Sequence, residues 1–267
     1  MPNSITSITF GPSFNQRIYS GFLPTNLKSI TFGRDFNQPV IPKSCTMVSL
    51  GYFFNHQLNL PSDGSITRLV MSDCFNQPIT VGSLPKTIRF ISFGDCFNQE
   101  LTKGILHDEI EEISFGNCFN QVLSTNSLPS NLRKLSFGFW FNQELAIPNN
   151  LVSLSFGDSF NQSIDGLFNN CNSLKELKFG YCFDCTIKYG SFPITLETLY
   201  FGGSFNKPLD IGILPIYLTK LVFGSNYNHI IKPNYLPPNL YSLQFGDKYN
   251  QPILKDSFPS SIKEVVF

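Results

Sequence analysis

Two cysteines in a Cys-x-x-Cys spacing could do redox or metal chemistry in this sequence. Cys182 and Cys185 flank Phe183 and Asp184, and such a pair serves elsewhere as a redox dithiol or as half of a zinc site. A closed zinc site needs four ligands, and no second cysteine pair or nearby histidine completes this one. We interpret the pair as variation within a repeated structural position.

The three histidines do not converge on one site either. His56 and His229 occupy the same position of a repeat, and His107 stands where most repeats have Pro. The chain also lacks a phosphate-binding loop, a G-x-S-x-G nucleophile motif, an H-E-x-x-H zinc motif and a dinucleotide-binding fingerprint. We therefore predict a protein that is not an enzyme, with no catalytic residues, no metal and no cofactor.

Composition and charge narrow the possible partners. The 267 residues are 42% apolar, which is ample for a packed core. Lys plus Arg equals Asp plus Glu at 19 each, so no long-range field favours nucleic acid or an acidic membrane. The N-terminus lacks signal-peptide features, no apolar run could span a bilayer, and the odd count of seven cysteines suits a reducing compartment. We expect a soluble cytoplasmic protein that binds neither nucleic acid nor membrane.

A repeat explains the high phenylalanine content of 28 residues. Phe or Tyr followed by Asn recurs at a usual step of 22 residues, and Asp184 is the one replacement of the Asn. The frame is P-x-x-L-x-x-L-x-F-G-x-x-F-N-Q-x-[IL], complete from Pro129 to Leu145, and its two Phe positions hold most of the phenylalanines. This period is typical of a solenoid, in which each repeat buries its apolar face against its neighbours.

The alternation within the repeat predicts a short strand. In Leu135-Ser136-Phe137 the two large side chains point inward and the serine points outward. Helices on the return path are disfavoured, because Pro recurs there and two of the steps shrink to 18 and 19 residues. We predict a mainly β, leucine-rich-repeat-like solenoid with a parallel sheet of about 13 short strands and few or no long helices. Residues 1–267 would form a single domain of 12 repeats plus a terminal half repeat.

The residues at the corner after each strand can be given structural roles. Gly94 relieves the Cβ restriction if the turn needs positive φ, and Phe97 anchors the corner inside. The following Asn98 can satisfy backbone groups at the bend and link one coil to the next, so that Asn120→Ala should cost about 1 to 3 kcal/mol by leaving buried backbone groups unpaired. Asp184 would make a local weak point, because a carboxylate cannot donate. The predicted ladder comprises Asn15, Asn37, Asn55, Asn76, Asn98, Asn120, Asn142, Asn161, Asn206, Asn228 and Asn250.

The L-x-x-L-x-F run followed by a corner Asn resembles the leucine-rich repeat, and Phe36-Asn37-Gln38-Pro39 resembles the core of the FNIP repeat family more closely. Twelve matches cover nearly the whole chain. The resemblance implies proteins of amoebae and large DNA viruses in which an F-box often precedes the repeats and the repeats recognise a target for ubiquitin ligation. Pro2 already opens the first repeat, so we expect no F-box here and carry over only the recognition role.

Function should use the outward positions of the strands, which packing leaves free. The large outward residues suggest a protein-recognition surface, since aromatic and Arg side chains supply most interface energy. The candidate partner-binding residues are Arg68, Phe90, Lys178, Tyr200 and Lys220. Two alternatives stay open: a Ser/Thr array that binds a repeating ligand such as a polysaccharide, and a structural protein that self-associates through ends that look uncapped.

Overall fold

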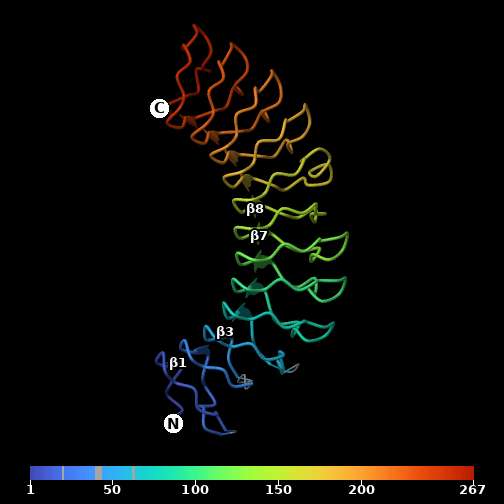
Figure 1. Ribbon diagram of the computed structural model, residues 1–267, viewed down its shortest axis with the longest axis vertical. Helices are drawn as coiled ribbons and strands as arrows, with labels where there is room; N and C mark the ends of the chain where they lie inside the picture. The colour runs from blue at the N-terminus through green and yellow to red at the C-terminus, as the bar shows by residue number, and fades with distance from the viewer. Residues whose placement is uncertain (20, 40–43, 62–63) are drawn as a thin grey trace. The chain divides into compact units, whose positions relative to one another are not determined.

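The computed structural model describes residues 1–19, 21–39, 44–61 and 64–267. The chain divides into two compact units, a first unit of Met1–Leu132 and a second unit of Arg133–Phe267. Each unit consists of successive coils, and each coil contributes one strand of three residues (Figure 1).

The strands of the first unit are β1 (Ser7–Thr9), β2 (Ser29–Thr31), β3 (Met47–Ser49), β4 (Arg68–Val70), β5 (Phe90–Ser92) and β6 (Glu112–Ser114). Those of the second unit are β7 (Lys134–Ser136), β8 (Ser153–Ser155), β9 (Glu176–Lys178), β10 (Thr198–Tyr200), β11 (Lys220–Val222), β12 (Ser242–Gln244) and β13 (Glu264–Val266).

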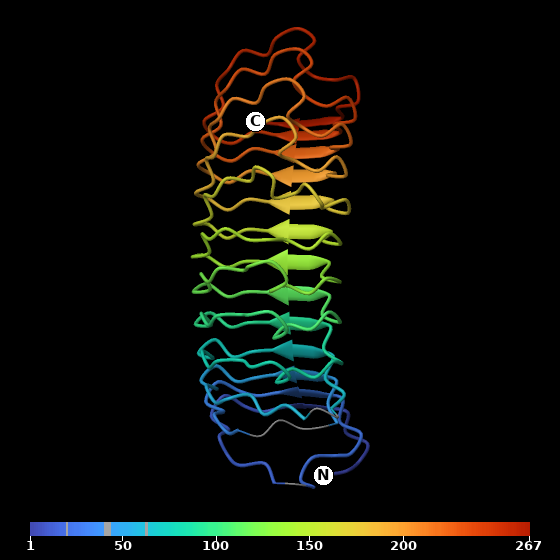
Figure 2. The ribbon, with the colours of Figure 1, turned by 90° about the vertical axis from the view of Figure 1, so that its right-hand side faces the viewer.

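Within each unit, neighbouring strands pair in parallel and keep equivalent repeat positions in register. Lys220 of β11 pairs with Thr198 of β10 and with Ser242 of β12. The register survives a shortened repeat, since Ser29 pairs with Met47 although this step is only 18 residues. Figure 2 shows the strands of each unit side by side and pointing the same way. The predicted solenoid with a parallel sheet of about thirteen short strands is confirmed.

The core of each unit is a stack of identical layers. Leu199 at the centre of β10 is fully buried, and Phe205 at the corner is also 0% exposed. The rings of Phe201 and Phe205 stack with centroids 3.9 Å apart inside one coil, and Phe205 lies 6.1 Å from Tyr227 of the next coil. Full burial of one such ring is worth about 1.5 to 3 kcal/mol. The two phenylalanine columns therefore hold coil to coil.

The asparagine ladder is present, at the surface of the corner. Asn76 Oδ1 accepts the backbone N–H of Asn98 at 2.9 Å, and Gln99 Nε2 donates to the same oxygen at 3.0 Å. Asn228 repeats this pattern in the second unit with the residues of the next coil. The ladder side chains are half-buried or exposed. The ladder was expected to satisfy buried backbone groups; the structure places its bonds in a part-buried or exposed corner, where water can replace a lost bond.

Asp184 does not weaken the ladder, contrary to the sequence-based expectation. Its Oδ1 accepts the backbone N–H of Asn206 at 2.9 Å, and its own N–H donates to Asn161 Oδ1 at 2.9 Å. Lys207, which occupies the Gln position of the next repeat, places Nζ 2.8 Å from Asp184 Oδ2. The ladder uses the side-chain oxygen as an acceptor, so a carboxylate serves as well as an amide.

The glycine that follows most strands allows close approach between coils, and it is not needed for positive φ. Gly94 and Gly116 are not among the residues with positive φ. A Cβ at Gly116 would lie 2.2 Å from the carbonyl oxygen of Gly94 in the preceding coil. The predicted physical reason for this glycine column was therefore wrong. Positive φ occurs instead in the return turns, as at Gly104 with φ of 88°.

The return path consists of turns and extended segments, as the recurrent Pro predicted. Within residues 1–19, 21–39, 44–61 and 64–267 no residue is helical. Accordingly, this part of the chain contains no helix with the length and apolar character needed to cross a membrane.

Candidate partner-binding face

Two of the five candidate residues meet on the outward face of the first unit. Arg68 on β4 and Phe90 on β5 are paired in register. The Arg68 guanidinium carbon lies 3.5 Å from the centroid of the Phe90 ring. A cation over a ring face at this distance is attractive by about 0.5 to 1 kcal/mol at an exposed site. The pair therefore presents a guanidinium group stacked on an aromatic ring at the outward face.

The other three candidates meet on the outward face of the second unit. The Tyr200 ring on β10 lies between two ammonium groups, with Lys178 Nζ 4.9 Å and Lys220 Nζ 5.4 Å from its centroid. Lys178 also forms an ion pair of 2.8 Å with Glu176. This hydrogen bond raises the pKa of Lys178 and lowers the pKa of Glu176. Lys220 differs from Lys178, because no carboxylate among the described residues forms an ion pair with it.

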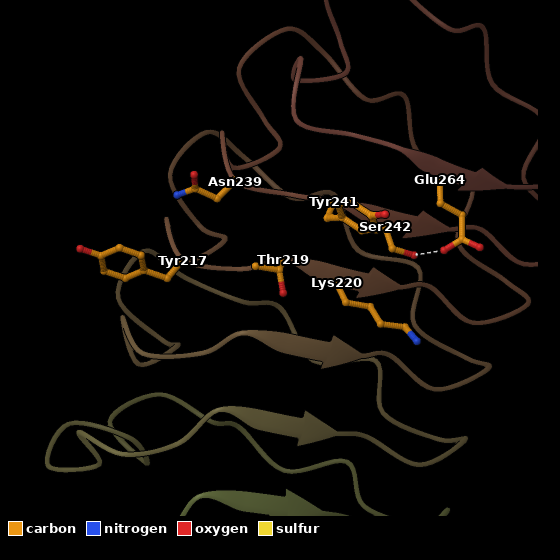
Figure 3. A pocket seen from close by; sticks show the side chains of 7 residues that line it. All are labelled: Tyr217, Thr219, Lys220, Asn239, Tyr241, Ser242 and Glu264. Atoms are coloured by element: carbon orange, nitrogen blue, oxygen red, sulfur yellow. Dashed lines mark hydrogen bonds between the residues drawn. The ribbon is translucent and has the colours of Figure 1, made fainter.

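An open groove lies next to Lys220, over β11 to β13, with a volume of about 840 Å³ (Figure 3). Such a volume is within the usual range for ligand sites. We call it the tyrosine groove, after its two exposed aromatic residues. Its lining residues are Tyr217, Thr219, Lys220, Asn239, Tyr241, Ser242 and Glu264.

Several polar groups of the tyrosine groove are already engaged. Ser242 Oγ donates to Glu264 Oε2 at 2.8 Å, as the dashed line in Figure 3 shows. Thr219 Oγ1 donates to the carbonyl oxygen of Glu197 at 3.0 Å, and Asn239 Nδ2 donates to that of Ile216 at 3.0 Å. The tyrosine rings and the Lys220 ammonium therefore remain as the groups most available to a ligand.

Local backbone geometry explains why Tyr217 is exposed. Leu218 N–H donates to the carbonyl oxygen of Pro215 at 3.1 Å, which closes a four-residue turn. Tyr217 occupies a central position of that turn and points away from the core, with 58% of its surface exposed. Tyr241 immediately precedes β12 and is 56% exposed. Sequence reasoning missed both tyrosines because it considered only the strand positions. Their signal was available, since almost all other repeats have a small or polar residue at these two positions.

Cys185, His56 and His229 take the place of the glutamine in the ladder. Cys185 Sγ lies 3.2 Å from Asn161 Oδ1, in the place of the usual ladder glutamine, while Cys182 is exposed. His56 Nε2 and His229 Nε2 contact the carbonyl oxygens of Asn37 and Asn206 at 3.0 and 2.9 Å, also in the glutamine position. In the part of the chain that the structure describes, no three His, Cys, Asp or Glu side chains are grouped so as to hold a metal.

The repeat pattern matches a known family along the whole chain. The FNIP Repeat model matches residues 1–35, 14–53, 54–96, 97–139, 141–170, 171–204, 205–248 and 227–267. The chain belongs to the FNIP repeat family. This confirms the resemblance inferred from the Phe-Asn pairs. Solenoids of such repeats are generally non-catalytic scaffolds. Among curated proteins, none has a sequence that matches this FNIP repeat chain.

Solved structures with the same fold agree with this assignment. The crystal structure of CroV588, described as a circular LRR protein, is 36% identical, with a TM-score of 0.88. The match covers 100% of this chain and 43% of that protein, so the chain spans less than half the length of CroV588. An internalin (InlF) from Listeria monocytogenes matches with 15% identity and a TM-score of 0.50, over 98% of this chain and 87% of its own. The second likeness concerns the fold alone.

Proposed function

We propose that this FNIP repeat chain is a non-enzymatic scaffold that binds a protein partner through the outward faces of its sheets. The observation that supports it best is the order of the large outward side chains. Arg68 and Phe90 stack on each other in the first unit, and Tyr200 is held between Lys178 and Lys220 in the second. Side chains ordered before binding lose less conformational entropy on association.

A pull-down from cells that express the protein tests this proposal. Wild-type bait is compared with bait carrying Arg68→Ser and Phe90→Ser, and with bait carrying Lys178→Ser and Tyr200→Ser, by quantitative mass spectrometry. We expect a set of proteins that the wild type retains and at least one double variant loses. The control variant is Tyr189→Ser, since Tyr189 is 85% exposed but lies on a return turn.

Identical sets of retained proteins from wild-type and variant baits would refute the proposal. Ubiquitin-ligase subunits among the lost proteins would support the ligase context that the family resemblance implies. Self-association is the alternative function, and sedimentation velocity over a concentration series distinguishes it, because a self-associating chain sediments faster as its concentration rises.

A further inference from the structure

Three successive coils of the second unit have apolar residues at a turn position where most other repeats have polar ones. Their turns run from Pro193, Pro215 and Pro237 to the buried leucine three residues later. At the first central position of this turn the other repeats have mostly polar or charged residues, such as Asn3, Thr25, Lys86, Asp108, Ser130, Asn149 and Asn172. These three coils have Ile194, Ile216 and Pro238 instead. Ile194 is 61% and Ile216 is 50% exposed, so neither is needed for the core.

At the next position of the same turn, Tyr217 replaces a residue that in other coils forms a hydrogen bond to the preceding coil. In five other coils this position ties one coil to the preceding one through a side-chain hydrogen bond to a backbone carbonyl. The donors of these bonds are Asn26, Thr87, Thr195, Asn239 and Ser261. Tyr217 forms no such bond in the described chain, and its ring is exposed. A structural bond is replaced by an exposed aromatic ring beside exposed isoleucines.

Exposed apolar groups that do not stabilise the fold mark interaction sites when they are contiguous. Asn239 donates to the backbone of Ile216, which places the isoleucine turn directly beside the tyrosine groove. Tyr217 and Tyr241 then line the groove itself. Tyrosine is enriched among the residues that dominate binding energy, since it combines a large apolar area with few rotatable bonds.

The charges around the groove are asymmetric. On the outward face beside it, Lys175 is paired with Glu197 at 2.7 Å and Lys178 with Glu176 at 2.8 Å. Lys220 forms no ion pair with any residue in the described ranges, and Glu264 on the opposite side is held by Ser242. The side of the groove formed by β11 thus offers a cation whose complement is a carboxylate from a partner.

We infer that the tyrosine groove binds an extended peptide segment of a partner protein in which an apolar residue lies next to Asp or Glu. Apolar side chains of the segment pack on the exposed rings of Tyr241 and Tyr217, which belong to different coils (Figure 3), and the carboxylate contacts Lys220. This inference rests on the proposed recognition function and assigns it a site and a ligand chemistry. A neutral oligosaccharide is disfavoured as the ligand, because exposed isoleucines and an unpaired ammonium add nothing to the binding of uncharged hydroxyl groups.

Selection from a phage-displayed library of random linear peptides tests the inference. The full chain is the target, and the selected peptides are synthesised with a fluorophore for anisotropy titrations. We expect a consensus with an apolar residue within one or two positions of Asp or Glu. The Tyr217→Thr/Tyr241→Thr variant should weaken binding about tenfold or more. Threonine occurs at both repeat positions in other coils, as at Thr87 and Thr219, so this variant should fold normally.

A charge reversal provides the sharper test. Selection against Lys220→Glu should yield peptides with Lys or Arg in place of Asp or Glu, because only the sign at the groove has changed. The Tyr189→Ser variant serves as the matched control, and its peptide affinities should equal those of the wild type.

The outcomes separate this inference from the proposed function. Peptides that bind equally to Tyr217→Thr/Tyr241→Thr but are lost with Lys178→Ser/Tyr200→Ser would overturn the groove and leave protein recognition standing. A library that yields no binding peptide, together with pull-downs that the face variants do not alter, would overturn both. Binding of neutral glycans on an array, abolished by the tyrosine variant in the absence of any peptide ligand, would also overturn the inference.

Discussion

At the scale of single residues, the ladder needs one well-placed acceptor per coil. Asn98 Oδ1 accepts the backbone N–H of Asn120 at 2.9 Å and the Gln121 Nε2–H at 3.1 Å. The glutamine position also accommodates other residues: His229 contacts the backbone carbonyl oxygen of Asn206, Cys185 contacts Asn161 Oδ1 and Lys207 contacts Asp184 Oδ2. Substitutions along the ladder are therefore tolerated when they keep an oxygen at the corner.

Replacing Asn98 with Ala should lower the free energy of unfolding by about 1 kcal/mol. The value lies at the lower end of the range for a lost hydrogen bond, because the half-exposed corner admits water. Urea denaturation followed by circular dichroism measures it. Asn59→Ala is the control, since Asn59 is exposed and outside the ladder. Equal losses in both variants would show that the ladder contributes nothing specific.

Asp184 and Lys207 should behave as a coupled pair. In a double-mutant cycle of Asp184→Asn and Lys207→Met, we expect a coupling energy of roughly 0.5 to 1 kcal/mol, because both side chains are partly exposed. Methionine is chosen because glutamine would form the ladder hydrogen bond with Asn at position 184. The coupling should shrink in about 1 M NaCl, where charges are screened. A coupling that high salt leaves unchanged would argue against an ion pair.

Cys45 should make stability fall at alkaline pH. Burial raises the pKa of this thiol from its ordinary 9.0 to about 11, against a smaller opposing effect of a hydrogen bond with Ser44. The folded state holds the thiol neutral, so its contribution is complete below pH 9.0 and is lost as pH rises to about 11. In that window the wild type should lose up to about 1.4 kcal/mol per pH unit relative to Cys45→Val. If the difference in free energy of unfolding between the two proteins is the same at pH 8, 9, 10 and 11, this prediction is contradicted.

At the scale of the elements, the spacing of the strands sets which residues fit at the corner. Parallel strands lie about 4.8 Å apart, and the chain leaves each strand against the carbonyl groups of the preceding coil. Glycine occupies this position in most coils because a Cβ there would meet the backbone of the preceding coil. After β4 the position holds the buried Ser72, whose Oγ donates to the carbonyl oxygen of Phe54. The constraint comes from the neighbouring coil and is absent in the first coil, where a Cβ at Gly11 would have nothing within 4 Å.

The glycine column therefore predicts unequal effects of one substitution. Gly116→Ala places a methyl group against the backbone of Gly94 and Asp95 and should destabilise by about 1 to 3 kcal/mol, as overpacking does. Gly11→Ala, at the same repeat position, should change the free energy of unfolding by less than about 0.5 kcal/mol. Thermal melts of both variants provide the comparison. A harmless Gly116→Ala would show that the coils can separate at no cost.

At the scale of the whole molecule, stability should be shared among coils, because each coil completes the core of its neighbours. The division into two compact units raises the question of how far this sharing extends. The sequence predicts one solenoid domain over residues 1–267, and this stays a prediction.

Trp140, the single tryptophan, lies in the first coil of the second unit, so its fluorescence follows unfolding there. If the chain is one domain, Gly33→Ala, whose Cβ would meet the backbone of Gly11 several coils away from Trp140, should shift the denaturation midpoint seen by Trp140 fluorescence together with that seen by circular dichroism. A Trp140 midpoint that stays in place while the other signal shifts would show two domains that unfold independently.

The sequence by itself determined the period, the strand, the inward Leu and Phe positions and the ladder partners. Each of these is a local property that the frame repeats, so regular recurrence reveals it without coordinates. The outward location of Arg68, Phe90, Lys178, Tyr200 and Lys220 followed from the same alternation.

Only the tertiary structure decided what happens between coils. The close contact at Gly116, the acceptor role of Asp184 and the assembly of Tyr217, Tyr241 and Lys220 into one groove depend on distances between residues of different coils. A repeat pattern states which positions are stacked. How closely the coils approach, and which side chains their turns leave exposed, is set by packing across the stack.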